Sequence, residues 1–227
     1  MTAIPQRRMG YYEIDGQFLP SVTTVLKVLN KPALINWAAK QGALAVLTDP
    51  VKYSTPEAAA RAIYEIDDVA MKRGSDAHKV AELYADAIIA GTADSFKSGN
   101  PYFKSIKAFF DTMRPEIIYR EVRLVNMEQG YAGTADLIAK VGSKTFVIDY
   151  KSSKGVFPEH HLQVEAYRQA TMIILEDGTR ITQHPIADAG AVVLLKADGT
   201  FGWVETAGDH IAFLAAMILF TWSESHP

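Results

Sequence analysis

Hydrophobic and polar positions alternate along residues 117–150, a pattern typical of half-buried β-strands. Three strands are predicted there, and a tight connection at Gly142 predicts that the last two are antiparallel neighbours. Because the side chains of a strand point alternately to opposite faces, Asp149 and Lys151 share one face. The connection carries Asp136 back alongside Asp149. The pattern therefore predicts two carboxylates and one ammonium group that project together.

Helical patterns precede these strands. Residues 33–90 are rich in alanine and predict helices interrupted near residues 49–50 and again at residues 73–74, where proline and glycine stand. After the second interruption, Ser75 is a candidate N-cap of an amphipathic helix. This start would place His78 in the first turn of that helix.

The two ends of the chain add a hairpin and further α/β elements. Residues 11–19 predict a hairpin that turns at Asp15 and Gly16, followed by a helix capped by Ser21. Helices and strands in this order indicate a mixed α/β fold. The other predicted elements are a helix from Pro158 through Ile174, strands at 191–196 and 201–205, and a buried helix at 211–222, too short to cross a bilayer.

Paired acids beside a lysine suggest a metal site. Carboxylate oxygens form a cage for a hard divalent cation such as Mg²⁺ or Mn²⁺, and the lysine supplies a fixed positive charge. The pattern alone is weak, because acids and lysines are common and most such matches are surface ion pairs. Asp149, however, ends an apolar run of β-prone residues, where an uncompensated charge is costly.

Three of these residues resemble the motif of the PD-(D/E)XK nuclease superfamily. The resemblance makes Asp136 the first acid, Asp149 the second acid and Lys151 the lysine. Gln163 and Tyr167 stand four residues apart on the next predicted helix, so they share one helical face. Their spacing resembles the QxxxY signature of the RecB-type branch and implies a catalytic role, although in isolation the pair would be a buried tyrosine with a surface glutamine.

Gly74 and His78 match the GxxxH pattern of the same branch, in which the histidine is a metal ligand. The resemblance implies that His78 and the backbone carbonyl of Tyr150 complete the ligand set of the two acids. An imidazole ligand makes Mn²⁺ more competitive with Mg²⁺. Without the resemblance, His78 would be read as a structural residue that pairs with Glu82 one turn later.

The order of these motifs, from about Pro20 to Tyr167, resembles the mitochondrial genome maintenance exonuclease group and its phage and bacterial relatives. The resemblance implies a restriction-endonuclease-like core and a DNA exonuclease that acts on single-stranded ends in recombination, repair or replication. It further implies one nuclease domain over residues 1–227, divided into a helical wall or arch (33–114), a catalytic core (115–206) and a C-terminal helix (207–227).

Some residues have two readings. Glu121 is either an additional acid of the site or a paired surface residue between Arg120 and Arg123. Lys104 and Lys107 are read as a solvated helical face, and the aromatic residues among them as core. The candidate DNA-binding residues are Ser21, Lys154 and Arg168.

Composition and charge limit the alternatives. The chain has 227 residues, 48% of them hydrophobic, and a net charge of −3, so any track for DNA must be a local patch. It has no cysteine, which removes disulfides, thiolate zinc sites and the iron–sulfur cluster of some RecB-type relatives. No segment reads as an export signal or a membrane span, so we expect a cytoplasmic protein of a bacterium or a phage-infected host.

We expect DNA as the partner, together with a helicase or recombination protein, and no membrane. Two other functions stay open: a structure-selective endonuclease or junction resolvase on the same core, and a nucleic-acid-binding protein without catalysis.

Overall fold

The computed structural model describes residues 7–226, except for the side chains of residues 7, 8, 33 and 66–70. The chain forms two compact units, one of Met1–Val28 with Ala77–Pro227 and the other of Leu29–Asp76. The single domain expected over 1–227 stays a prediction. The sequence predicts no export signal in the first ten residues. Of these, residues 1–6 lie outside the described part of the chain.

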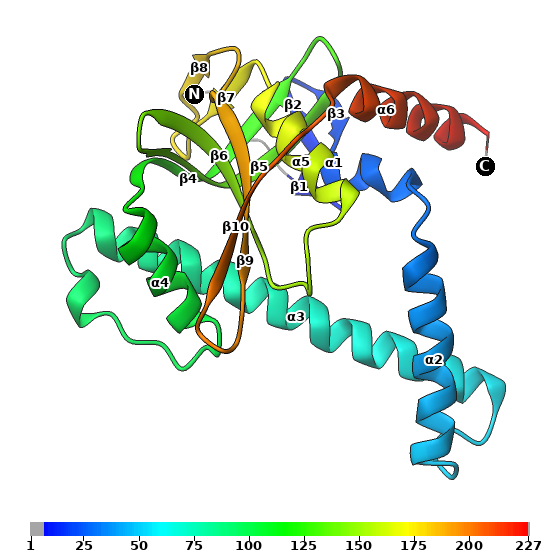
Figure 1. Cartoon of the computed structure of the whole chain (residues 1–227). Helices are drawn as coiled ribbons and strands as arrows, with labels where there is room; N and C mark the ends of the chain where they lie inside the picture. The colour runs from blue at the N-terminus through cyan, green and yellow to red at the C-terminus, as the bar shows by residue number, and fades with distance from the viewer. Residues whose placement is uncertain (1–6, 227) are drawn as a thin grey trace. The chain divides into compact units, whose positions relative to one another are not determined.

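The larger unit contains a seven-stranded sheet in the order β10-β9-β6-β5-β4-β7-β8 (Figure 1). Strands β6 and β9 are parallel and every other neighbouring pair is antiparallel. The chain is thus α/β, with a mixed sheet flanked by helices, as predicted. The strands are β4 (Glu116–Asn126), β5 (Tyr131–Val141), β6 (Lys144–Lys151), β7 (Met172–Ile174), β8 (Arg180–Thr182), β9 (Ala189–Leu195) and β10 (Phe201–Glu205).

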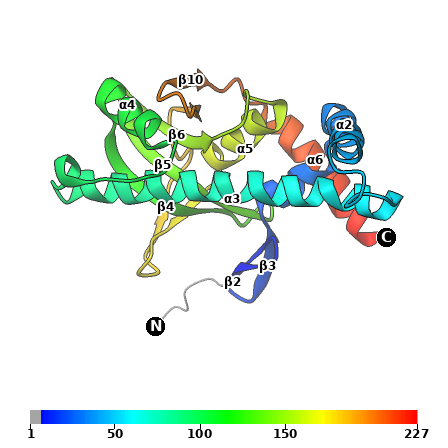
Figure 2. The same cartoon turned by 90° about the horizontal axis from the view of Figure 1, so that it is seen from below.

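Helices cover both faces of this sheet. The last turns of α3 (Pro56–Ile89) and helix α4 (Phe103–Met113) bury Ala81 and Phe109 in one core with Ile148 and Tyr150 of β6. In Figure 1 α4 and the last turns of α3 lie below β4, β5 and β6, and in Figure 2, which is seen from below, the last turns of α3 pass in front of the sheet. Helix α5 (Pro158–Arg168) packs against the opposite face of the sheet, where it contacts β9, β6 and β5. The aromatic residues around Lys104 and Lys107 lie in or against the first core, as expected: Tyr102, Phe103, Phe109 and Phe110.

A small N-terminal sheet of β1 (Arg7–Arg8), β2 (Tyr11–Ile14) and β3 (Gln17–Pro20) packs against β4 and β5. Its hairpin turns at Asp15 and Gly16, whose φ angles of 51° and 76° are left-handed, as the Asp-Gly pair predicts. The hydroxyl of Ser21 accepts the backbone N–H of Thr24 and caps α1 (Val22–Val25), which also confirms the predicted cap. A 3₁₀ turn (Leu26–Val28) follows.

The smaller unit consists of α2 (Pro32–Thr48) and the first part of α3. The interruption expected near residues 49–50 is present, since α2 ends at Thr48 and α3 begins at Pro56. The interruption expected at residues 73–74 is wrong, because α3 continues through Gly74 to Ile89. A glycine inside a helix costs only about 1 kcal/mol, and the alanine-rich turns on both sides favour propagation. Ser75 is therefore an interior residue and does not cap a helix.

Two further predictions are wrong in part. The helix that begins at Pro158 ends at Arg168, and Ile173 and Ile174 lie in β7 instead, where these β-branched residues pair with β4. Helix α6 (His210–Ser225) buries only one side, because Phe213, Ala216 and Phe220 are buried while Ile218 and Trp222 are 70% and 60% exposed. In the described part of the chain, no helix is long and apolar enough to span a membrane.

Candidate active site

Strand β6 presents Asp149 and Lys151 together, as the alternation predicts. The Nζ atom of Lys151 lies 2.6 Å from Oδ2 of Asp149, whose side chain is 2% exposed. Between them in sequence, Tyr150 turns the other way, into the core with Phe146 and Ile148. A charged pair thus stands at the end of a buried apolar strand.

Asp136 joins this pair from β5. The antiparallel register pairs Leu137 with Ile148, so the next position along each strand brings Asp136 level with Asp149. The ladder stops there, and Oδ2 of Asp136 instead accepts the backbone N–H of Tyr150 over 2.7 Å. The side chain of Asp136 therefore bonds where the next backbone hydrogen bond of the ladder would form, and this holds it beside Asp149.

His78 reaches the same acids from α3. Its Nδ1 atom lies 3.2 Å from Oδ1 of Asp136, and its ring stands edge-on to Tyr150 with the ring centroids 6.2 Å apart. The alternative partner, Glu82, binds Lys79 over 2.7 Å. His78 thus lies next to the acids, but well inside a long helix and not in a first turn.

Gln163 and Tyr167 approach from α5. The Nε2 atom of Gln163 donates to Oδ1 of Asp149 over 2.8 Å and to the hydroxyl of Tyr167 over 3.1 Å, and both side chains are buried. The ring of Tyr167 covers Gly133, where a β-carbon would overlap it. The glutamine is therefore buried and bonded to an acid, unlike the surface glutamine of the alternative reading.

Charges within this cluster perturb one another. Burial alone would lower the pKa of His78, but the Asp136 carboxylate raises it to about 9. Burial would raise the pKa of Asp136, and the nearby His78 and Lys151 hold it below its usual value. The pKa of Asp149 is raised, since its burial and the repulsion by Asp136 outweigh the attraction of Lys151. Displaced pKa values of this kind concentrate at functional sites.

Glu121 lies beside these acids on β4. Its neighbours Arg120 and Val122 pair with Leu137 and Ala135, which puts Glu121 opposite Asp136. Burial, followed by repulsion from Asp136 and Glu82, raises the pKa of Glu121 to about 7. Its backbone is left-handed, with φ of 45°, a conformation that costs free energy in a non-glycine residue and concentrates at functional sites.

In the alternative interpretation, Glu121 is a surface residue paired with Arg120 or Arg123, which flank it in the sequence. Arg120 pairs with Asp86 and lies 3.4 Å from Glu176, while Arg123 has no such partner in the described residues. The placement of Glu121 opposite Asp136 therefore fits the additional acid better than a paired surface residue.

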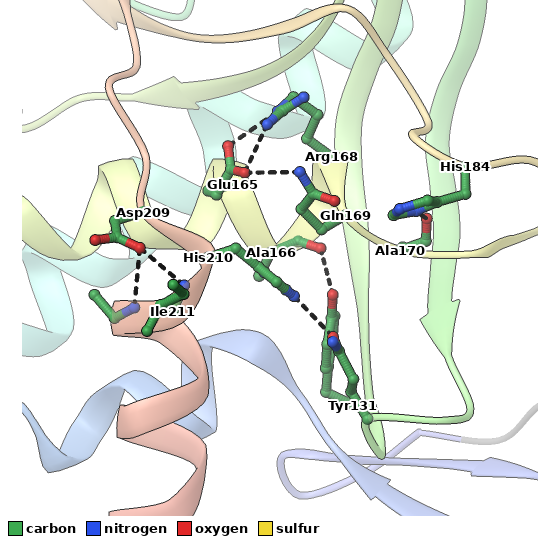
Figure 3. A network of polar contacts seen from close by, with 12 residues as sticks. Tyr131, Glu165, Ala166, Arg168, Gln169, Ala170, His184, Asp209, His210 and Ile211 are labelled. Carbon is green, nitrogen blue, oxygen red and sulfur yellow. Dashed lines mark hydrogen bonds and ion pairs between the residues drawn. The ribbon is translucent and has the colours of Figure 1, made fainter.

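The candidate DNA-binding residues do not join the cluster. Ser21 is 3% exposed and caps α1, and Lys154 is exposed in the loop after β6. Arg168 donates two hydrogen bonds to Glu165, within a polar network that links α5 to Gln169 (Figure 3). Their DNA-binding role stays a prediction. Lys107 pairs with Asp111, as a solvated helical face would.

Tyr12 is a neighbour of the site that its sequence position does not reveal. Its hydroxyl lies 2.9 Å from that of Thr134, two residues before Asp136, and its side chain is 3% exposed. The packing of the N-terminal hairpin against β5, together with the bridge between Ser21 and Ala132, brings Tyr12 to this place. That contact joins segments more than a hundred residues apart, and no spacing within the hairpin signals it.

The donor set fits a divalent cation. Oδ2 of Asp149 is buried and accepts no hydrogen bond from the residues that the structure describes, although it lies next to Lys151. Over the same residues, no group of three or more histidine, aspartate or glutamate side chains stands arranged around a common point for a metal. Mg²⁺ is commonly held by one or two carboxylates together with water and substrate phosphate. Asp136 and Asp149 supply two carboxylates here.

Comparisons with known proteins leave the family open. No family model and no curated protein matches the chain. A solved structure entitled "Crystal structure of SSO0001" is similar over 91% of this chain and 77% of that chain, with 16% identity and a TM-score of 0.39.

Proposed function

We propose that this chain is a divalent-metal-dependent DNA exonuclease with a PD-(D/E)XK core that hydrolyses phosphodiester bonds from single-stranded ends. The observation that carries the proposal is the buried Asp149–Lys151 pair, 2.6 Å apart, with Asp136 level with it on the next strand. Burying such a pair costs free energy, so its place at a strand end needs a functional reason. The preference for single strands rests on the motif resemblance.

In this proposal Asp136 and Asp149 hold the cation, with the carbonyl of Tyr150 and the imidazole of His78 as further ligands. A bound divalent cation supplies Lewis acidity to the scissile phosphate and lowers the pKa of water. Glu121, opposite Asp136, is placed to add a carboxylate when its proton is lost.

Lys151 stabilises the charge that develops on the phosphoryl oxygens, because its ammonium group is fixed beside Asp149 before substrate arrives. Gln163 orients Asp149 by its hydrogen bond, and Tyr167 orients Gln163 in turn. Gln163 and Tyr167 thus act on the geometry of the acid. The activity suits recombination, repair or replication in the cytoplasm of a bacterium or a phage-infected host, with a helicase or recombination protein as partner.

The deciding experiment is digestion of end-labelled linear DNA, single-stranded and duplex, with Mg²⁺, with Mn²⁺ and with chelator. Closed circular single strands test the mode of attack. We expect metal-dependent loss of linear single strands from an end and survival of the circles. Duplex DNA should be a poor substrate, because opening it costs about 1.4 kcal/mol per base-pair step.

Lys151→Ala is the control for a contaminating nuclease, since it should lose the activity. Rapid cutting of the circles would instead support the endonuclease or resolvase. Binding without cleavage under every metal condition would support a non-catalytic nucleic-acid-binding protein.

A further inference from the structure

A cleft of about 480 Å³ opens along β4 on the side away from β5. Residues 117–123 form its floor, Ile89 at the end of α3 forms one wall, and Ile174 at the end of β7 forms another with residues 175–177. Glu121, which faces Asp136, is part of the floor. The cleft therefore adjoins the candidate active site, and its volume lies within the range of sites that bind small ligands, about 300–1,000 Å³.

The cleft follows an uncovered strand edge. Strand β4 pairs with β5 along its whole length, whereas β7 pairs with it only from Arg123 to Val125. The backbone of the preceding residues on that side has no neighbouring strand in the sheet. Such an edge presents free N–H and C=O groups to a ligand.

The shape of this edge disfavours a peptide. The register shifts between Ile117 and Tyr119, and the backbone of Glu121 is left-handed. These two irregularities interrupt the ladder that an added peptide strand would need. Single N–H groups remain free to bond phosphate oxygens, which are common partners of backbone N–H groups in nucleic-acid complexes.

Arg123 supplies a positive charge. Its half-buried side chain makes no hydrogen bond or ion pair with any residue of the described part, although Arg120 beside it is held by Asp86. An unpaired guanidinium in a cleft is suited to a phosphate, which it can bind with two parallel hydrogen bonds. Three acids, Glu121, Glu176 and Asp177, also line the cleft. The side chain of Glu176 is 83% exposed and lies 3.4 Å from Arg120, which offsets its charge, and Asp177 accepts the backbone N–H of Thr179.

The walls are apolar and open. Ile89 and Ile118 are 61% and 44% exposed, and the buried Ile174 of β7 also lines the cleft. Exposed apolar side chains beside an unpaired guanidinium match a nucleotide, in which the apolar face of a base lies near a charged phosphate.

We infer that this cleft holds a nucleotide of the single-stranded substrate next to the one whose phosphate is cut, with its phosphate on Arg123. The assignment rests on the proposed nuclease function and adds to it the path of the strand, along the free edge of β4. Arg123 is a substrate-positioning residue in this arrangement, outside the ligand set of the metal.

The first test measures binding. An Asp149→Asn protein, which cannot cut, is titrated against a fluorescent single-stranded oligonucleotide by anisotropy at several salt concentrations. Adding Arg123→Ala should weaken binding about tenfold and reduce the slope of log affinity against log salt by about one phosphate contact, close to 0.7 for single strands. Lys196→Ala is the matched control, because Lys196 is exposed and follows β9, three strands away from β4 in the sheet. It should change neither the affinity nor the salt dependence.

The second test locates the strand. Because the chain has no cysteine, Ile118→Cys in the Asp149→Asn protein introduces a single thiol. An oligonucleotide that carries a mixed disulfide with a small thiol, tethered to one nucleotide near its end, should undergo exchange with this thiol in high yield, which forms the protein–oligonucleotide disulfide and releases the small thiol. Ile218→Cys, at a more exposed position on α6, is the control for random collision and should give at least tenfold less.

The outcomes separate the two proposals. If the Asp149→Asn protein binds no oligonucleotide at all, the nuclease proposal fails, and the cleft assignment with it. If it binds and neither Arg123→Ala nor the cross-link distinguishes the cleft from its controls, only the cleft assignment is overturned.

Discussion

The carboxylate of Asp136 accepts the backbone N–H of Tyr150, and this bond continues the contact between β5 and β6 beyond their last backbone pair, Leu137 with Ile148. The bond occupies one oxygen of Asp136 and leaves the other to His78. Asp149 has a similar division, with Gln163 on one oxygen and Lys151 beside the other. Each acid is therefore fixed by the protein on one oxygen and lies near a cationic or titratable group on the other.

Removing one acid tests the metal mechanism. We expect Asp149→Asn to lose detectable nuclease activity while circular dichroism and cooperative unfolding stay close to those of the parent protein. The amide can still accept the hydrogen bond of Gln163, but it lacks the charge that a cation needs. Asp198→Asn, at an exposed turn, is the control and should be fully active. Cleavage that persists in chelator would rule out the metal mechanism.

Replacing the lysine separates binding from catalysis. Lys151→Ala should bind metal and oligonucleotide but lower kcat by roughly two to three orders of magnitude, the scale for one preorganised electrostatic group. Single-turnover digestion measures this loss. Lys140→Ala, at an exposed position of β5, is the control. Turnover near that of the parent protein would mean that Lys151 is only a structural partner of Asp149.

The role of His78 predicts a dependence on the metal. His78→Ala should reduce activity more with Mn²⁺ than with Mg²⁺, because imidazole suits the softer ion better. Titration of each metal in parallel digestion assays measures the two losses. Equal losses would point to a purely structural contact between His78 and Asp136.

Glu121 predicts a change of stability with pH. Its pKa is raised from 4.5 to about 7 in the folded protein, so folding keeps a proton that the unfolded chain releases between these values. The loss of folding stability caused by this carboxyl is absent below pH 4.5, grows as the pH rises and is complete above about pH 7. The full difference corresponds to roughly 3 kcal/mol, and solvent at this half-buried group reduces it to about 1–2 kcal/mol.

The corresponding measurement is urea unfolding with chelator from pH 4 to 8. Glu121→Gln should be more stable than the parent protein above pH 7 and equal to it near pH 4. Glu116→Gln, an exposed position on the same strand, should show no such trend. A stability difference that does not vary with pH would contradict the raised pKa.

Gly133 predicts a steric effect on the site. A methyl group there overlaps the ring of Tyr167, so Gly133→Ala should destabilise the fold by about 1–3 kcal/mol and lower kcat by moving Gln163. Gly99→Ala is the control, because nothing lies near its added carbon. Thermal unfolding and initial rates measure the two effects, and an unchanged kcat would show that Tyr167 does not set the position of Gln163.

Local patterns predicted the strands that carry the acids. The alternation around Asp149 and the turn at Gly142, which has a φ of 61°, depend on nearest neighbours only, and the structure has both. The Asp-Gly turn of the N-terminal hairpin is local in the same way. The sequence thus contains enough information for the β5–β6 hairpin and for the approach of Asp136 to Asp149.

The features that sequence reasoning missed depend on distant contacts. Gly74 reads as a break, yet the turns around it keep α3 continuous. Ile173 reads as a continuation of a helix, yet it pairs with Leu124, almost fifty residues earlier. Arg168 donates to Glu165 of the same helix, which competes with any nucleic acid for the guanidinium group. The sequence does not show which of these partners Arg168 binds. Propensity is a weak guide where tertiary pairing offers more hydrogen bonds.

The parallel pairing of β6 with β9 has a consequence for the order of folding. Strands β5 and β6 are joined by a tight turn, so both acids can meet as soon as that hairpin forms. Strand β9 reaches β6 only after the chain has closed a loop from Lys151 to Ala189. Non-local pairing of this kind closes slowly, because the chain must lose loop entropy before it gains contacts. We expect the charged pair to assemble early in water and to lose its solvent last, when β9 covers the open edge of β6.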